Sequence, residues 1–200
     1  MAEDPDLSPG EWAVLGLLAE GPTHGFAVAR VLAHDGSVGQ AWRVPRPLVY
    51  RALTTLTERG LSQVQGAETG NRGPQREVYG ATPKGLRAVR HWLEQPVRHP
   101  RDVRSLLMLK LALGARRGLD SSGLLQAQRD AMDPIVDNLS QRVQMTAGFD
   151  RTLALWRVES ARGVQRFVDD LIGKGARERT SPPPGSPLHE VPDQVKLPVR

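Results

Sequence analysis

The sequence of 200 residues contains no cysteine. Disulfide bonds, zinc sites built from thiolates and cysteine nucleophiles are therefore excluded. The sequence also has no apolar run near the ~18 residues that a membrane-spanning helix needs, and its acidic first residues, 1–9, lack the apolar core of a signal peptide. These absences predict a cytoplasmic protein that has no membrane partner.

Arrangements of residues that carry catalysis are missing as well. The glycine-containing stretch at 66–73 is not followed by the Lys-Ser/Thr pair of a phosphate-binding loop, and no Ser/His/Asp arrangement or close pair of carboxylates stands out. The five histidines do not have the spacing of metal ligands. We therefore expect no enzymatic activity, no metal site and no cofactor.

The positive charge is concentrated in one part of the chain. The formal net charge is +5, yet residues 1–42 are net negative. Residues 43–90 hold nine basic and three acidic side chains. Such a focused basic segment is typical of a protein that binds nucleic acid, although a solvated surface rich in arginine would have the same composition.

Residues 7–95 have the pattern of three helices, a β-hairpin and a fourth helix. Ser8 and Glu11 form a capping box at the start of the first helix, and Gly60 is the left-handed cap expected at the end of the third. Phe26 is expected to face the core from the second helix. The expected bounds are helices at about 9–20, 24–33 and 47–59, strands at 61–65 and 76–81, and a helix at about 82–94.

The pattern changes after a linker at 96–101. Residues 105–113 are apolar almost all round and predict a buried helix. Ser121 can cap a long helix that contains Pro134, and a last helix follows it. The tail, 174–200, is rich in proline and is expected to be disordered, because it cannot bury a core.

Three helices followed by a hairpin predict a winged helix-turn-helix within a mainly α-helical protein. In this fold the third helix lies in the major groove of double-stranded DNA, and the hairpin contacts the flanking backbone or the minor groove. We expect most of the polar side chains to contact phosphates, which accept the majority of hydrogen bonds at protein–DNA interfaces. The predicted DNA-binding residues are His24, Arg46, Tyr50, Arg51, Thr54, Thr55, Asn71, Arg72, Gln75 and Arg76.

Some of these side chains have an alternative role. His24 stands at a helix start, where it can cap the helix, and Tyr50 can pack between the helix and the hairpin. Arginine pairs with guanine as well as with phosphate, so the residue type does not decide between base and backbone contacts for Arg46 or Arg51.

Five segments of the N-terminal region form a combined pattern: LGLLAEGPTHGF at 15–26, LVYRAL at 48–53, ERGL at 58–61, REVY at 76–79 and TPKG at 82–85. With these segments, residues 1–95 resemble the PadR family of transcriptional regulators. Two sites depart from the family's pattern, because residues 47–51 read Pro-Leu-Val-Tyr-Arg in place of Gly-Thr-Leu-Tyr-Pro and Phe26 replaces a tyrosine. The resemblance implies a homodimer, often a repressor, that acts on an inverted-repeat operator. Some members of the family bind small aromatic or phenolic effectors, so the resemblance also implies such an effector here.

The last helix carries a nearly heptad apolar stripe, which predicts that the helical region 102–173 holds a dimer together. Two copies could place their third helices ~34–36 Å apart, one turn of DNA. Trp156, on this stripe, is the candidate to contact an effector, although an aromatic residue at helical spacing is more often plain core. The predicted dimerisation residues are Phe149, Leu153, Trp156, Val164, Phe167 and Leu171.

The sequence thus predicts a bacterial, sequence-specific DNA-binding regulator of transcription. We expect a repressor that binds its operator as a homodimer and is released by a small aromatic effector. Two alternatives stay open. A protein–protein adaptor built on the winged helix would have no affinity for DNA at physiological salt, and an architectural DNA-binding protein would bind a scrambled operator equally well.

Overall fold

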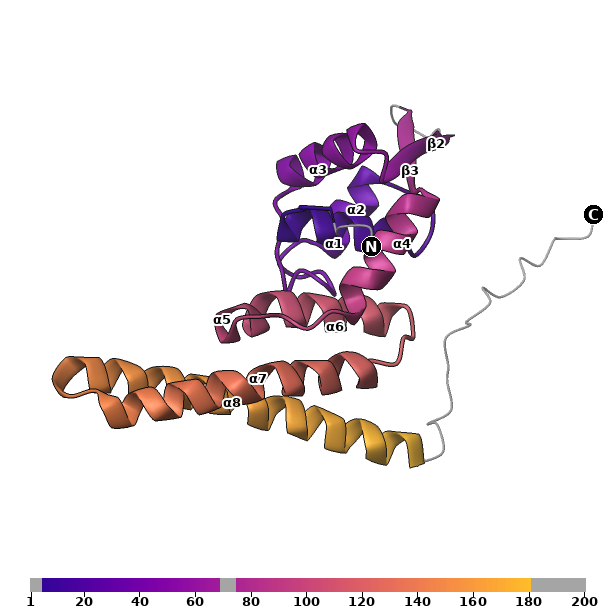
Figure 1. Ribbon diagram of the computed structural model, residues 1–200. Coiled ribbons are helices and arrows are strands. Elements are labelled where there is room, and N and C mark those ends of the chain that lie inside the picture. The colour runs from indigo at the N-terminus through magenta and orange to yellow at the C-terminus, as the bar shows by residue number, and fades with distance from the viewer. Residues whose placement is uncertain (1–4, 69–74, 181–200) are drawn as a thin grey trace, which may run out of the picture.

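The computed structural model of the chain describes residues 5–68 and 75–180 (Figure 1). The predicted wing residues Asn71 and Arg72 and the stretch 181–200 of the predicted tail lie outside the described residues. The described part is mostly helical with one small antiparallel sheet, which confirms the predicted fold class. None of its helices is both long enough and apolar enough to cross a membrane.

Helix α1, Pro9–Leu18, lies at the centre of the N-terminal half. It begins at the predicted capping box, in which Glu11 N donates to Ser8 Oγ at 3.3 Å and Ser8 N donates to Glu11 Oε2 at 2.7 Å. Every residue from Trp12 to Leu18 is buried, because α1 is in contact with the third, fourth and sixth helices. Helix α1 is therefore the scaffold on which the surface elements of this half are arranged.

Helix α3, Arg46–Glu58, packs on α1 and on α2, Gly25–Val31. Its buried residues occupy one face and are Val49, Ala52, Leu53 and Leu56. The helix is followed by Gly60 with a φ of +66°, the left-handed conformation that the sequence predicted. Because the apolar residues lie on one face, the opposite face of α3 is open to solvent.

Strands β2, Ser62–Glu68, and β3, Arg76–Ala81, form the predicted antiparallel hairpin. A third strand, β1 at Thr23–His24, pairs with the other edge of β3, so the sheet order is β1-β3-β2. Strand β1 has no counterpart in the sequence prediction, because two residues are too few to show an alternating pattern. It fixes the start of α2 beside the hairpin.

Helix α4, Pro83–Glu94, runs from the sheet along α1 towards a second layer of helices (Figure 1). It begins at Thr82, whose hydroxyl accepts a hydrogen bond from Gly85 N at 3.1 Å. Near its end, the ring of Trp92 stacks on Trp12 with centroids 4.8 Å apart and planes at 6°. This stack fixes the end of α4 against α1.

The second layer consists of α5, Pro100–Asp102, a π-helical turn at Val103–Leu107, and α6, Met108–Arg116. The sequence predicted one buried helix at 105–113. The structure divides this segment between a π-helical and an α-helical part, a change of pitch that apolar periodicity does not reveal.

Helix α6 shares its core with the N-terminal half. Leu109 and Leu113 belong to the same hydrophobic cluster as the buried residues of α1 to α4. At Gly16 of α1, a Cβ would lie 2.6 Å from Leu113 Cδ1, so a larger residue at this position would force the leucine side chain to move. The predicted boundary between a domain at 7–95 and a region at 102–173 stays a prediction.

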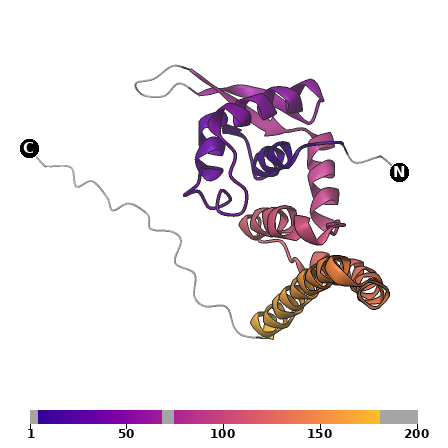
Figure 2. The ribbon, with the colours of Figure 1, turned by 90° about the vertical axis from the view of Figure 1, so that its left-hand side faces the viewer.

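Helices α7, Ser122–Met145, and α8, Gly148–Thr180, form a long antiparallel hairpin beyond the second layer (Figures 1 and 2). Ser121, the predicted cap of α7, makes no capping hydrogen bond, and Asp120 Oδ1 instead accepts from Ser122 N at 2.9 Å. The structure therefore confirms the long helix and corrects its cap.

Helix α8 extends past the point where the chain was expected to become disordered. The prediction placed residues 174–200 in a disordered tail, whereas the helix continues to Thr180. The reason is in the sequence, because the residues after Gly173 include no proline until Pro182. For residues 174–180 the structure thus has a helix in place of the predicted tail.

The α7–α8 hairpin forms hydrogen bonds with Val97, in the linker after α4. Gln128 of α7 is fully buried, and its Oε1 accepts a hydrogen bond from Val97 N at 2.8 Å. Its Nε2 donates to Val97 O at 3.0 Å. Since the side chain satisfies both backbone groups of one residue, it joins α7 to the linker as a strand neighbour would.

Candidate nucleic-acid interface

The solvent-facing side of α3 carries the polar residues that the sequence predicted there. Arg46, Tyr50, Arg51 and Thr54 are exposed, and Thr55 is half-buried. Thr54 Oγ1 donates to Tyr50 O at 3.2 Å within the helix. Helix α3 thus presents two guanidiniums and a phenol to solvent along its first half.

A groove of about 780 Å³ lies between the start of α2, α3 and the hairpin. Four predicted DNA-binding residues line it: His24, Tyr50, Gln75 and Arg76. Gly25 permits this arrangement, because a Cβ there would lie 2.9 Å from Tyr50 Cε1. The structure therefore brings residues of three elements to one groove, while the remaining predicted residues of α3 lie outside its lining.

His24 is the N-terminal cap of α2. Its Nδ1 accepts a hydrogen bond from Ala27 N at 3.0 Å, so the capping role that the sequence left open is filled. When Nδ1 accepts, the neutral imidazole carries its proton on Nε2, which is then a donor. A contact of His24 with DNA stays a prediction and would use Nε2.

Phe26 belongs to this surface, although it was expected to face the core. Its side chain is 37% exposed, and it lines the groove. The Cζ atoms of Arg46 and Arg76 lie 5.3 Å and 5.2 Å from its ring centroid. The inward prediction is wrong because α2 has only seven residues, and its first turn lies at the rim of the groove. Periodicity over so short a helix does not define a buried face.

An acidic residue, Glu77, lines the groove beside Arg76 and reduces the positive charge there. Tyr79 OH donates to Glu77 Oε2 at 2.5 Å. This hydrogen bond, together with burial and the charge of Glu77, raises the pKa of Tyr79 to about 12. The phenol is protonated at neutral pH, as an unperturbed tyrosine is, and its hydrogen bond holds the carboxylate in place. An anion is expected to approach the groove from the side of α3 and Arg76, away from Glu77.

Some basic side chains of the segment 43–90 lie outside the groove. Lys84 Nζ donates to Arg59 O at 3.1 Å, and Arg59 Nη1 donates to Asp6 O at 2.5 Å. Arg90 lies on α4, outside the groove. The positive charge that the sequence predicts for this segment is therefore shared between the groove and other surfaces.

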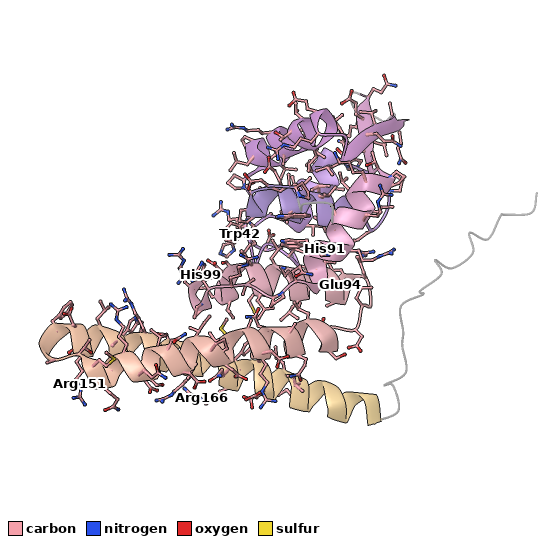
Figure 3. All side chains as sticks on the ribbon, in the orientation of Figure 1. Trp42, His91, Glu94, His99, Arg151 and Arg166 are labelled. Atoms are coloured by element: carbon pink, nitrogen blue, oxygen red, sulfur yellow. The ribbon has the colours of Figure 1, made fainter. Side chains whose placement is uncertain are left out.

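A second hollow of about 490 Å³ lies where α4, α6 and the start of α7 meet. Its lining includes Arg90, Glu94 and Lys110. Figure 3 shows His91 and Glu94 at the end of α4 that is next to α6, away from α3. Trp156, the predicted effector residue, does not line this hollow. Among the described residues, no group of three or more His, Asp or Glu side chains is placed to hold a metal ion.

The predicted dimerisation stripe of α8 separates into two sets. Phe149 and Trp156 are 78% and 71% exposed, and Phe167 is also exposed. Val164 and Leu171 are half-buried, because they pack on a cluster of their own chain. Leu153 is half-buried as well.

The exposed set lies on one side of α8. Phe149, Trp156 and Phe167 follow each other at about two and about three helical turns. The residues of α8 that are fully buried against the same chain lie on the other side and are Ala154, Val158, Ala161 and Val168. A single chain therefore leaves a row of large apolar side chains uncovered.

Residues 14–91 match the model of a family described as the transcriptional regulator PadR-like family. The crystal structure of PadR from Bacillus subtilis in complex with operator DNA is similar, with 19% identity over 82% of this chain and 97% of that chain and a TM-score of 0.42. The structure of smu.1604c from Streptococcus mutans UA159 is 12% identical over 82% of this chain and 98% of that chain, with a TM-score of 0.39. Among curated proteins, no match was found. The family match begins within α1 and ends within α4, and so includes every element of the groove.

Proposed function

We propose that this protein is a sequence-specific DNA-binding repressor of transcription, and the match of residues 14–91 to the model of the transcriptional regulator PadR-like family supports this. It binds an inverted-repeat operator as a homodimer in the bacterial cytoplasm, and a small aromatic effector releases it. The family consists of regulators rather than enzymes. The observation that carries the proposal is the groove at which α2, α3 and the hairpin meet, which Arg76 lines, together with the exposed Arg46 and Arg51 on α3.

Arg76 in the groove and Arg46, which contacts the groove residue Phe26, are available to an external anion. Among the described residues, neither Arg46 nor Arg76 forms an ion pair or a side-chain hydrogen bond. Guanidinium N–H groups bind phosphate oxygens with short, charge-assisted hydrogen bonds. The two arginines therefore suit the DNA backbone, and Arg51 and Thr54 continue the polar face of α3 towards the base edges.

The uncovered row on α8 supports the homodimer. Phe149, Trp156 and Phe167 are large apolar side chains that one chain leaves in water, and burying such side chains stabilises association. A second copy offers the same row, as a two-fold interface requires. In such a dimer the two α3 helices would meet successive major grooves, ~34–36 Å apart.

The effector is proposed to act at the dimer interface. Trp156 presents most of its indole to solvent, and an aromatic ring can stack on it. A ligand that binds there in only one of two dimer arrangements would change the distance between the α3 helices and so the affinity for the operator.

The proposal is tested by titrating the full-length protein into labelled DNA from the region upstream of its own gene, at two salt concentrations. Saturable, salt-sensitive binding that scrambled DNA does not compete is expected for a specific regulator. Equal competition by scrambled DNA would favour an architectural protein, and no binding to a selected pool of genomic DNA would favour an adaptor. Small aromatic compounds added to the specific complex then test release.

Arg51→Ala is expected to weaken operator binding by about 1–3 kcal/mol and to relax the preference at one base position, if Arg51 reads a base. Its side chain is exposed on α3, so the fold is expected to be unaffected. Binding is measured by fluorescence anisotropy on the operator and on single-base variants. Arg87→Ala, which removes an exposed arginine of α4, is the matched control. A uniform loss across all sequences would assign Arg51 to phosphate instead.

A further inference from the structure

Phe26 is exposed, and two arginines from different elements share its ring. It lies in the first turn of α2. Arg46, the first residue of α3, and Arg76, the first residue of β3, place their Cζ atoms 5.3 Å and 5.2 Å from the ring centroid. The side chain is 37% exposed, so burial accounts for its covered part but not for its contact with two cations.

Two guanidiniums near one ring repel each other unless something offsets their charge. Neither Arg46 nor Arg76 forms an ion pair within the described ranges, and Glu77, the chain neighbour of Arg76, is hydrogen-bonded to Tyr79 instead. The face of an aromatic ring attracts a cation that lies within about 6 Å of its centroid. The ring of Phe26 therefore holds both guanidiniums near its centroid. Without the ring, their mutual repulsion would favour positions further out in solvent.

We propose that Phe26 is a positioning residue of the DNA interface. Its ring holds the guanidiniums of Arg46 and Arg76 as a pair, so that α3 and the hairpin bind neighbouring phosphates of one DNA strand together. This inference rests on the proposed DNA-binding function. The ring makes no hydrogen bond to DNA itself. It raises affinity because two long side chains that are already ordered lose less freedom when they bind.

The two arginines depend on Phe26 to different degrees. Arg46 Cζ also lies 5.8 Å from the ring centroid of Tyr50, which would retain part of the contact without Phe26. Arg76 has no second ring contact within residues 5–68 and 75–180. Removal of the ring is therefore expected to disturb the arginine of the hairpin more than the arginine of α3.

The test is a double-mutant cycle of Phe26→Leu and Arg76→Gln, with binding to a short mixed-sequence DNA duplex measured by anisotropy at low salt. A mixed sequence is sufficient because phosphates are present in every duplex. Phe26→Leu is expected to weaken binding about five- to tenfold in the wild-type background. In the Arg76→Gln background, the same change is expected to weaken binding by less than about twofold, because the two residues act as a unit.

Two further variants separate the ring from the fold. Phe26→Tyr keeps an aromatic face and is expected to bind within about twofold of the wild type. Leu86→Ala removes an exposed apolar side chain of α4 and is expected to change nothing. Side-chain NMR of the free protein is expected to show a ring-current shift of Arg76 signals that Phe26→Leu abolishes while the melting temperature stays the same.

The outcomes distinguish this inference from the proposed function. An equal loss in both backgrounds, or the absence of a ring-current shift, would mean that Phe26 acts through the fold, and would overturn the inference alone. A wild-type protein that binds every duplex equally would contradict specific regulation, yet a non-additive cycle on that duplex would still support the inference. A wild-type protein that binds no duplex overturns both.

Discussion

Replacement of Trp156 with aspartate is expected to split the dimer into folded monomers and to abolish operator binding at the same time. Within one chain the indole is 71% exposed, so the substitution removes no contact that the chain needs for its own fold. In the proposed dimer a second copy covers the same indole, and a carboxylate there would be buried without a partner. Each monomer would bind only one half-site of the operator. The loss of the contacts with the second half-site is expected to weaken binding by about 100-fold or more.

Sedimentation and operator binding are measured on the same preparations of Trp156→Asp, with circular dichroism to establish that the helices are intact. Leu155→Asp is the matched control, because this neighbouring leucine is also exposed (43%) but points about 100° away around α8. The control is expected to remain dimeric and to bind. A Trp156→Asp protein that sediments as an intact dimer would show that the exposed row of α8 is not the interface.

The largest loss of stability is expected at Lys110, a buried lysine with a side chain only 3% exposed. Its Nζ donates to Trp92 O at 2.5 Å and to Gln95 O at 2.6 Å, and it lies 4.5 Å from the ring centroid of Trp92. The ammonium thus satisfies carbonyls at the end of α4, where the helix dipole favours a cation. Lys110→Met keeps the length and the packing of the side chain but leaves these carbonyls without their donor. We expect a free energy of unfolding lower by about 2–4 kcal/mol.

Urea unfolding followed by circular dichroism measures this change, at one protein concentration because association contributes to the stability of a dimer. Lys174→Met, at an exposed position on α8, is the control and is expected to change the free energy of unfolding by less than about 0.5 kcal/mol. If both variants unfold at the same urea concentration, the hydrogen bonds of Lys110 do not stabilise the fold.

The elements that the sequence predicts well are those whose ends are marked locally. The capping box of Ser8 and Glu11 and the left-handed Gly60 lie where the sequence placed them. Both signals act within a few residues, so no knowledge of distant partners is needed. The mainly helical fold with a hairpin follows from such signals together with apolar periodicity.

Features that depend on distant partners were not predictable in the same way. Strand β1 exists because β3 pairs with it, and Lys110 is buried because the end of α4 accepts its hydrogen bonds. Phe26 is exposed because the groove passes beside the first turn of α2. Each of these features depends on a contact with an element that is distant in the sequence. Composition and the spacing of residues carry no information on such contacts.

The candidate site was predicted in part. His24, Tyr50, Gln75 and Arg76 do line one groove, although their contacts with DNA stay predictions. These residues could be selected because they are polar and lie at a predicted helix start, on the predicted third helix or in the predicted hairpin. The sequence did not indicate the aromatic ring that both arginines contact, because an apolar residue in a short helix is expected to be core.

The close contact between Gly16 of α1 and Leu113 of α6 bears on how the chain can be divided. A fragment that ended after α4 would open the face of α1 that Leu109 and Leu113 cover, and would expose a core to water. A part of the chain that is expected to fold on its own must therefore include at least α1 to α6. Residues 14–91, which the family model matches, are therefore not expected to fold on their own.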